Sequence, residues 1–439
     1  MFNHILKFAA SFLFLLAVTA AAQTNGLPVI KIETRGSAVI ACRQKWTDVR
    51  SFVLTDPDNS RNNVSRVDIG SRPDRIRGRG NSTWNAPKKS YRVRFRENVS
   101  LFGLAEAKNW VLLANWFDPT LGIKTSFAFE LGSRLSVPHT PTHNHVELYL
   151  NGEYQGVYLL TEHRQPAPAG VEPGPGRVGV DRLEGWMVEF NFRGEKKNIE
   201  PRFKTANYSL PLVIKSPDFG NDSERGGYDI VKRDWNRLCD LMAAADFPEN
   251  GYRDLIDIES FVNYFMVQII TRNHDFNHPA SVFFHKDKNG KIRAGPLWDF
   301  DLSFGAGWVG TKAEFADKYY SNREAAGTAP DSRVYPTHAF FNRFFEDPVF
   351  HAKWRENWNK NFPAISSMPL FINGMANKIR ESAKENYKIW RLDEQVDFDY
   401  WVEEMKNYFY ARLDYLDSVY NSVEIFPASA SRQQIHRGE

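Results

Sequence analysis

The chain has few cysteines: of its 439 residues, only Cys42 and Cys239 are cysteine. A small disulfide-rich scaffold needs a dense set of cysteines, so that class of protein is excluded. One bridge formed in an oxidising compartment and two separate buried thiols both fit this composition. The fold must therefore depend mainly on a hydrophobic core, and the chain is long enough to bury a large one.

Long apolar runs are also missing beyond the N-terminus. Lys7 precedes an apolar run over residues 8–18, and small residues follow over 19–22. This is the order of a secretory signal peptide, with cleavage after Ala22. A membrane anchor is the alternative reading, but the run is shorter than the roughly 20 residues that a spanning helix needs. We expect export to the periplasm or the extracellular space, and no membrane segment after cleavage.

A strong excess of one charge is absent as well. The net charge is +3, and cleavage would also remove Lys7, so the protein lacks the strongly basic body that favours nucleic acid. Aromatic residues, in contrast, are abundant, with 12 Trp and 33 Phe. Such residues often line carbohydrate clefts, which leaves polysaccharide contact open, although their core-like spacing favours a bulky core.

The patterning changes from strands to helices along the chain. Alternating residues over 28–34 and 89–95 predict strands, and two apolar runs flanking Asn151-Gly152 predict a β-hairpin. Asp118 is expected to cap a helix that starts at Pro119. From about residue 225 onward helical periodicity dominates, with helices predicted over residues 228–244 and 258–271 and a short strand pair turning at residues 289–290.

These patterns predict an α+β fold with two lobes, the outline of a kinase-like phosphotransferase. We divide the chain into a signal peptide (1–22), a strand-rich N-terminal lobe (23–164), a connector with additional strands (165–225), a helical C-terminal lobe (226–425) and a tail (426–439).

The most informative residues are three aspartates in the C-terminal half. Asp275 follows a predicted helix, and Asp299 and Asp301 lie two dozen residues later, beyond a small hairpin. Phosphoryl transfer needs one carboxylate for the attacking hydroxyl and others for the metal that bridges the nucleotide phosphates. Oxygen ligands suit Mg²⁺ or Mn²⁺. Helix and turn capping is the alternative role for these acids.

A basic, glycine-rich turn lies in the N-terminal half. Arg77 and Arg79 flank Gly78 in this turn, and Lys88 and Lys89 lead into the next predicted strand. Backbone amides and cations together form phosphate-binding loops, so these side chains are candidates for nucleotide binding. Lys89 is the preferred lysine because the alternation places it on the apolar face of its strand, where phosphate or Glu162 would be its partner. The histidines show no zinc-ligand spacing, and no Gly-x-Ser-x-Gly elbow is present.

Several blocks of this sequence resemble the CotH family (spore coat protein H), which consists of atypical protein kinases. The blocks occur in family order at residues 77–82, 88–91, 112–119, 147–162, 273–275 and 295–305. Together they cover most of the chain that follows the predicted signal peptide.

The resemblance implies a kinase that binds ATP with Mg²⁺ or Mn²⁺ and phosphorylates Ser or Thr of an exported protein. By correspondence with the family motifs, Asp275 is the expected catalytic carboxylate, and Asp299 and Asp301 are the expected metal ligands. Arg79, Lys88, Lys89 and Glu162 are then expected at the nucleotide.

The stretch after Asp275 departs from the family pattern, which places an Asn or similar ligand shortly after the catalytic Asp. Here Asn277 is the candidate metal ligand, and Ser281 is its substitute. This departure keeps a second function open, a non-catalytic kinase-like module that binds surface proteins or polysaccharide. A glycan-cleaving enzyme with paired carboxylates is the third reading.

Overall fold

The computed structural model describes residues 26–56, 74–163, 185–193, 201–217, 225–277, 280–305 and 336–421. The predicted signal peptide and the proline- and glycine-rich part of the connector lie outside these ranges. No helix in the described ranges is both long and apolar enough to cross a membrane.

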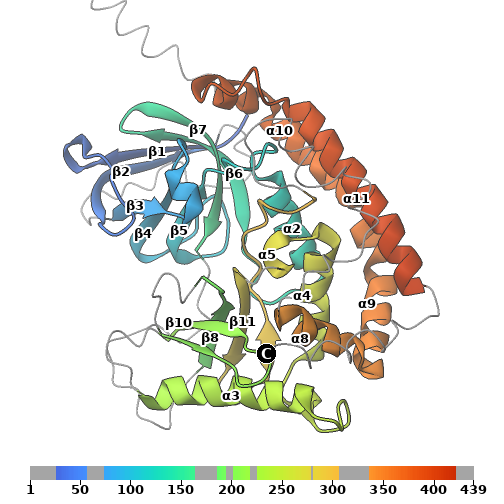
Figure 1. Cartoon of the computed structure of the whole chain (residues 1–439). Helices are drawn as coiled ribbons and strands as arrows, with labels where there is room; N and C mark the ends of the chain where they lie inside the picture. The colour runs from blue at the N-terminus through green and yellow to red at the C-terminus, as the bar shows by residue number, and fades with distance from the viewer. Residues whose placement is uncertain are drawn as a thin grey trace, which may run out of the picture.

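The N-terminal part forms a closed barrel (Figure 1). Its seven strands, in the order in which they pair around the barrel, are β1 (Val29–Thr34), β2 (Thr47–Thr55), β3 (Arg75–Arg79), β4 (Ser90–Val99), β5 (Ala107–Leu113), β7 (Glu153–Glu162) and β6 (His143–Leu150). All neighbours are antiparallel except β1 and β6, whose parallel pairing closes the barrel. Alternate residues such as Ile30, Ile32 and Val93 fill its interior.

The hairpin predicted at Asn151-Gly152 is confirmed, since it joins β6 to β7. Both turn residues have positive φ, 51° and 82°, which is the backbone of a type I′ turn. This turn fixes the register of β6 against β7.

A second sheet of five strands lies below the barrel in Figure 1, and helix α3 (Arg225–Ala243) runs along it. The strand order is β12 (Ile292–Ala294), β11 (Val282–Asp287), β8 (Gly185–Phe190), β10 (Pro211–Ser216) and β9 (Arg202–Lys204). Its buried face is aromatic: Trp235 packs against Phe190 and Phe284 at ring distances of 5.2 Å.

The remaining helices pack around both sheets. They are α2 (Ile123–Arg134), α4 (Ile258–Thr271), α5 (His274–Asn277), α8 (Pro336–Phe345), α9 (Pro348–Ser366), α10 (Met368–Ile389) and α11 (Phe398–Asn421), with short 3-10 turns at Arg35–Ser37, Ser82–Asn85 and Tyr252–Asp254. Helix α4 matches its predicted bounds and lies against α2 and α9. Most of its residues are buried.

The α+β prediction is confirmed, but a closed barrel beside a second sheet replaces a clear two-lobed layout. Helix α10, near the C-terminal end of the chain, packs on β7 of the barrel and on α2. The core interpretation of many aromatic residues also holds, because six tryptophans of the described ranges are at most 3% exposed: Trp110, Trp186, Trp235, Trp298, Trp354 and Trp358.

The predicted start of the first helix is wrong. Helix α2 begins at Ile123 after Gly122, whose φ of 97° is left-handed. Asp118 instead holds the preceding turn, since its carboxylate accepts hydrogen bonds from the backbone nitrogens of Thr120 and Gly122 at 2.9 and 3.0 Å. An aspartate that bonds to the backbone two residues on stabilises a turn as readily as a helix cap.

Candidate active site

The segments that carry the three aspartates lie side by side in the fold. Helix α4 ends at Thr271, the next residue Arg272 has a left-handed φ of 46°, and the chain then enters the short helix α5 that bears Asp275. The segment around Asp299 comes from the end of β12. Two backbone hydrogen bonds join these segments: His274 N donates to Leu302 O at 3.2 Å, and Phe304 N donates to Thr271 O at 2.7 Å.

Asn273 connects the two acidic segments directly. Its Oδ1 accepts the Asp275 backbone N–H at 3.2 Å, and its Nδ2 donates to the Asp299 backbone carbonyl at 3.4 Å. The side chain is 2% exposed. Sequence reasoning assigned no role to this residue, although a buried amide right after a helix end is a signal for such a bridge.

The Asp299 side chain has a partner from the second sheet. Ser281 Oγ donates to Asp299 Oδ2 at 3.1 Å, and Ser281 N donates to Glu189 Oε1 at 3.2 Å. Glu189 in turn pairs with Lys215 at 2.7 Å. Ser281, the predicted substitute for Asn277, therefore lies beside the Asp299 carboxylate. Asn277 ends α5, and its side chain lies outside the described atoms.

Asp275, Asp299 and Asp301 form an electrostatically coupled group, which we call the acidic centre. Asp275 is 7% exposed. Burial, followed by the charges of Asp299 and Asp301, raises its pKa well above the ordinary value, while Arg193 opposes this rise. Burial, Asp299 and Asp118 likewise raise the pKa of Asp301 to about 7, and Lys124 lowers it. Carboxylates gathered in this way favour a cation among them.

Lys124 and Asp118 adjoin the acidic centre. The sequence patterns assigned neither of them to the site. Lys124 lies in the first turn of α2 and is 4% exposed. Burial lowers its pKa, and the charges of Asp118 and Asp301 oppose that change. The predicted helix start at Pro119 placed Lys124 further along the helix, whereas α2 begins at Ile123 and Lys124 lies in its first turn. Lys124 was therefore not assigned to the site from the sequence.

The barrel meets the acidic centre at Trp298, the residue before Asp299. The Arg79 guanidinium at the end of β3 lies over the Trp298 ring, 5.6 Å from its centroid. His163, just after β7, contacts the same ring at 6.3 Å. Of the predicted nucleotide residues, Arg79 is therefore the one that the fold brings beside the acidic segment.

The sequence matches the model of the CotH kinase protein family over residues 76–416. The chain belongs to the CotH kinase family. The matched region spans most of the chain and includes all eight predicted site residues. A comparison with curated proteins gave no match. The family is one of kinase-like proteins.

Two lysines expected at the nucleotide of this CotH kinase family member bind protein atoms instead. Lys88 is 1% exposed, and its Nζ donates to Val157 O and, at 2.8 Å, to Asn386 Oδ1 of α10. Lys89 Nζ donates to Trp84 O at 2.7 Å. The preference for Lys89 as the buried lysine is wrong, because β4 begins at Ser90 and Lys88 is the lysine that enters the core.

Glu162 is buried at the end of β7, where it fixes the start of β6. Its carboxylate accepts hydrogen bonds from the backbone N–H and the hydroxyl of Thr142, both at 2.9 Å. Burial raises its pKa, and the Thr142 hydrogen bonds oppose that rise. Among the described residues, these contacts hold the Glu162 side chain within the barrel. The next residue in the sequence, His163, is the one that contacts the Trp298 ring.

A preformed metal cage is not found in the described ranges: no group of three or more His, Cys, Asp or Glu side chains is arranged to hold an ion. His139 and His285 form a ring pair at 4.7 Å without such a group. Mg²⁺ commonly takes part of its coordination from nucleotide phosphates.

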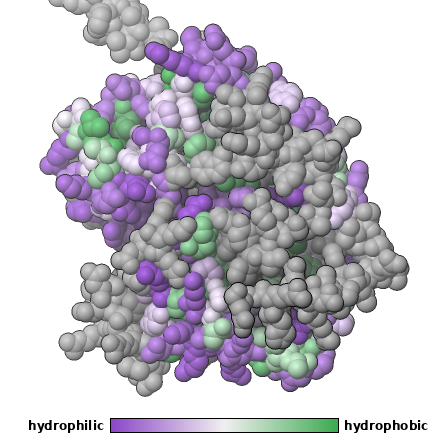
Figure 2. Space-filling model, viewed as in Figure 1, coloured by the Kyte–Doolittle hydropathy of each residue, from purple (hydrophilic) through white to green (hydrophobic). Residues whose placement is uncertain are grey.

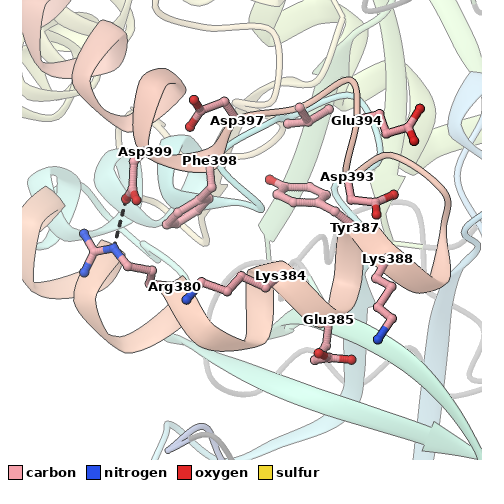
Figure 3. Close-up of a pocket in the computed structure, with 11 residues that line it drawn as sticks. Arg380, Lys384, Glu385, Tyr387, Lys388, Asp393, Glu394, Asp397, Phe398 and Asp399 are labelled. Atoms are coloured by element: carbon pink, nitrogen blue, oxygen red, sulfur yellow. Dashed lines mark hydrogen bonds and ion pairs between the residues drawn. The ribbon is translucent and has the colours of Figure 1, made fainter.

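A separate pocket lies between the end of α10 and the start of α11 (Figure 3). Its volume is about 590 Å³, and charged side chains of both signs line it. Arg380 and Asp399 face each other across it in an ion pair of 2.9 Å. Because opposite charges pair within the pocket, it lacks the one-signed character of a phosphate site. Its Tyr387 donates to Pro119 O at 2.7 Å, next to Asp118.

Proposed function

We propose that this protein transfers the γ-phosphate of ATP to Ser or Thr of an exported protein. The proximity of the buried Asp275 to the half-buried Asp299 and Asp301 carries this proposal, together with membership of the CotH kinase family. Phosphoryl transfer depends on positioning and on charge stabilisation, which a centre of this kind supplies.

The acidic centre fits a divalent cation. Its donors are carboxylate oxygens and the Ser281 hydroxyl, which are the ligands of Mg²⁺ and Mn²⁺. Three acids held near one another, one of them buried and two half-buried, are costly without a counter-charge. Asp299 and Asp301 would hold the ion, and ATP would complete its coordination. When bound, the ion would neutralise charge on the phosphate oxygens.

Asp275 would accept the proton of the attacking hydroxyl. A raised pKa makes a carboxylate a stronger base, which suits this task. Asn273 would hold both acidic segments in register through its two hydrogen bonds. Arg79, over Trp298, would contact a phosphate with its guanidinium N–H groups.

Substitution of the acidic centre tests this proposal. We expect Asp275→Asn and Asp299→Asn each to lower Mg²⁺- or Mn²⁺-dependent ATP consumption by about 10²-fold or more, since the first removes the general base and the second removes a metal ligand. The rate would be measured on purified mature protein, together with self-labelling from γ-labelled ATP. Asp254→Asn, an exposed acid in the 3-10 turn at Tyr252–Asp254, is the matched control. A wild-type protein that neither binds nor consumes ATP would overturn the proposal.

The alternative, a non-catalytic module that binds surface proteins or polysaccharide, rests on the high tryptophan content and on the departure from the family pattern after Asp275. Trp46 and Trp84 are half-buried on the barrel, but cations lie over both rings: Arg77 at 4.6 Å from Trp46 and Lys89 at 5.3 Å from Trp84. Rings engaged in this way are poor platforms for sugars, so the kinase-like function is favoured.

A further inference from the structure

Four arginines form a cationic face on the outside of the barrel. In the pairing of β3 with β4, Arg75 lies opposite Arg94, and Arg77 lies opposite Arg92. The residues between them on β3 and β4, Ile76 and Val93, point into the barrel and are buried. We call Arg75, Arg77, Arg92 and Arg94 the arginine face. In Figure 2 the hydrophilic surface at the lower left of the barrel lies over these strands.

This arrangement is unfavourable for the barrel alone. Like charges directly opposite each other on neighbouring strands are destabilising. Burial and then the charge of Arg94 lower the pKa of Arg77. Among the described residues, Arg75 forms an ion pair with the exposed Asp48 at 3.8 Å, and Arg92 donates to Asn109 Oδ1 at 2.9 Å. The Nε of Arg77 is buried with no hydrogen-bond partner among the described residues. A face of this kind is complementary to an anionic partner.

The arginine face leads toward the acidic centre. Arg75, Arg77 and Arg79 occupy alternate positions of β3 and so share one side of the strand. Arg79 lies over Trp298, the neighbour of Asp299. At ~3.3 Å per residue, the strand covers roughly 13 Å from Arg75 to Arg79. A bound chain that follows β3 therefore ends at the place where phosphate would be transferred.

We propose that the arginine face docks an acidic, extended stretch of the polypeptide that accepts the phosphate. This inference rests on the proposed kinase function and adds a substrate class to it. Side chains at alternate positions of an extended peptide repeat every ~6.6–6.8 Å, which matches the spacing of the arginine pairs along β3 and β4. Guanidinium groups bind carboxylates through paired hydrogen bonds. The acceptor carries Asp or Glu at alternate positions, a few residues from its Ser or Thr.

A polypeptide fits this face better than a nucleic acid or a glycan. Recognition of bases relies on open aromatic rings on which they stack, and sugars commonly pack on such rings too. Here the guanidinium groups of Arg77 and Arg92 lie 4.6 and 5.9 Å from the centroid of Trp46. The Trp46 ring packs against both guanidinium groups and is therefore not an open platform for stacking.

Binding of a labelled peptide of alternating Glu and Ser, followed by fluorescence anisotropy, tests the inference. We expect the full-length mature protein to bind it, more weakly as salt rises. Arg75→Gln/Arg94→Gln should weaken binding by about tenfold or more, since charge-assisted contacts are lost. Arg233→Gln/Arg237→Gln, two exposed arginines of α3, removes the same charge elsewhere and should leave binding unchanged.

The melting temperature separates docking from a structural role. Because Arg75 and Arg94 repel each other, their joint replacement should leave the melting temperature unchanged or slightly higher. A clear fall would assign the pair a structural role and overturn the inference. So would tighter binding of a single-stranded oligonucleotide or a polyuronate than of the peptide, or an equal loss of binding in the α3 variant.

The docking inference and the kinase function can be tested independently of each other. Asp299→Asn should retain peptide binding while it loses ATP consumption. ATP consumption without peptide binding would overturn the docking inference alone, and peptide binding without ATP consumption would overturn the kinase function alone.

Discussion

Asp74 is a buried carboxyl group at the start of β3, and it couples stability to pH. It is 2% exposed, and its Oδ1 accepts the Arg96 backbone N–H at 3.0 Å. Burial raises its pKa to about 6, with the Arg96 hydrogen bond opposing the rise. The folded protein therefore binds a proton more tightly than the unfolded chain does, and ionisation of Asp74 destabilises the fold.

We predict that Asp74→Asn stabilises the protein at neutral pH. Between about pH 4 and pH 6 the wild-type free energy of unfolding should fall as pH rises, because the unfolded chain ionises first. Asparagine keeps the acceptor for Arg96 and cannot ionise. The gain should be full above about pH 6 and vanish near about pH 4. Urea denaturation at both pH values measures it, and Asp254→Asn controls for the loss of one negative charge.

Lys88 shows how a single side chain joins distant elements. Its ammonium group links Val157 of β7 to Asn386 of α10, and it lies over the Tyr158 ring at 4.5 Å. Burial lowers its pKa well below the ordinary value. A phosphate role for Lys88 would require these hydrogen bonds to break, so we assign it to the contact between barrel and helix.

At the scale of elements, α10 is fastened to β7 around Gly156. Asn386 Oδ1 accepts both from Lys88 Nζ and from the backbone N–H of Val157, the latter at 3.1 Å. Trp390 Nε1 donates to Gln155 O at 3.2 Å. Gly156 has a φ of +89°, and a Cβ at this position would lie 2.3 Å from Asn386 Oδ1. The close approach of helix and strand therefore requires glycine.

We predict that Gly156→Ala destabilises the protein more than Gly152→Ala does. Both glycines have left-handed φ, so alanine costs about 1 kcal/mol of backbone strain at each. A Cβ at Gly152 meets nothing within 4 Å, whereas at Gly156 it displaces an amide that holds two hydrogen bonds. The extra cost should be about 1–3 kcal/mol. Chemical denaturation of both variants measures the difference, and equal losses would contradict the proposed fastening.

At the scale of the whole molecule, ligand binding should stabilise the fold through the acidic centre. That centre combines segments from α5, from the chain after β12 and from the start of α2, and Arg79 of the barrel lies against it. A ligand that joins these parts binds only the folded state and so raises the melting temperature.

We predict that ATP with Mg²⁺ or Mn²⁺ raises the melting temperature by several degrees. At ligand concentrations near 100 times Kd, the gain in stability is about 2.7 kcal/mol. A thermal-shift assay measures it. Asp299→Asn should lose the metal-dependent part of the shift, while Arg233→Gln should keep all of it. An identical shift in wild type and Asp299→Asn would contradict the proposed role of this carboxylate.

Much of the candidate site could be predicted, because its acids lie at the ends of strongly patterned elements. Asp275 follows α4, whose apolar periodicity is clear, and Asp299 follows the short hairpin of β11 and β12. Asn273 and Lys124 could not be assigned from patterning. Their importance depends on which distant segments lie beside them, and a buried polar residue is recognised only when its partners are known.

The sequence by itself determined the local structure: the hairpin at Asn151-Gly152, the bounds of α4 and the α+β class all follow from turn chemistry and periodicity over a few residues. Only the tertiary structure decided that β1 pairs with β6 to close a barrel, that Lys88 binds Asn386 and that Arg79 lies over Trp298. Periodicity specifies which face of an element is buried. The partner of that face is chosen by the packing of the whole chain, which no local window contains.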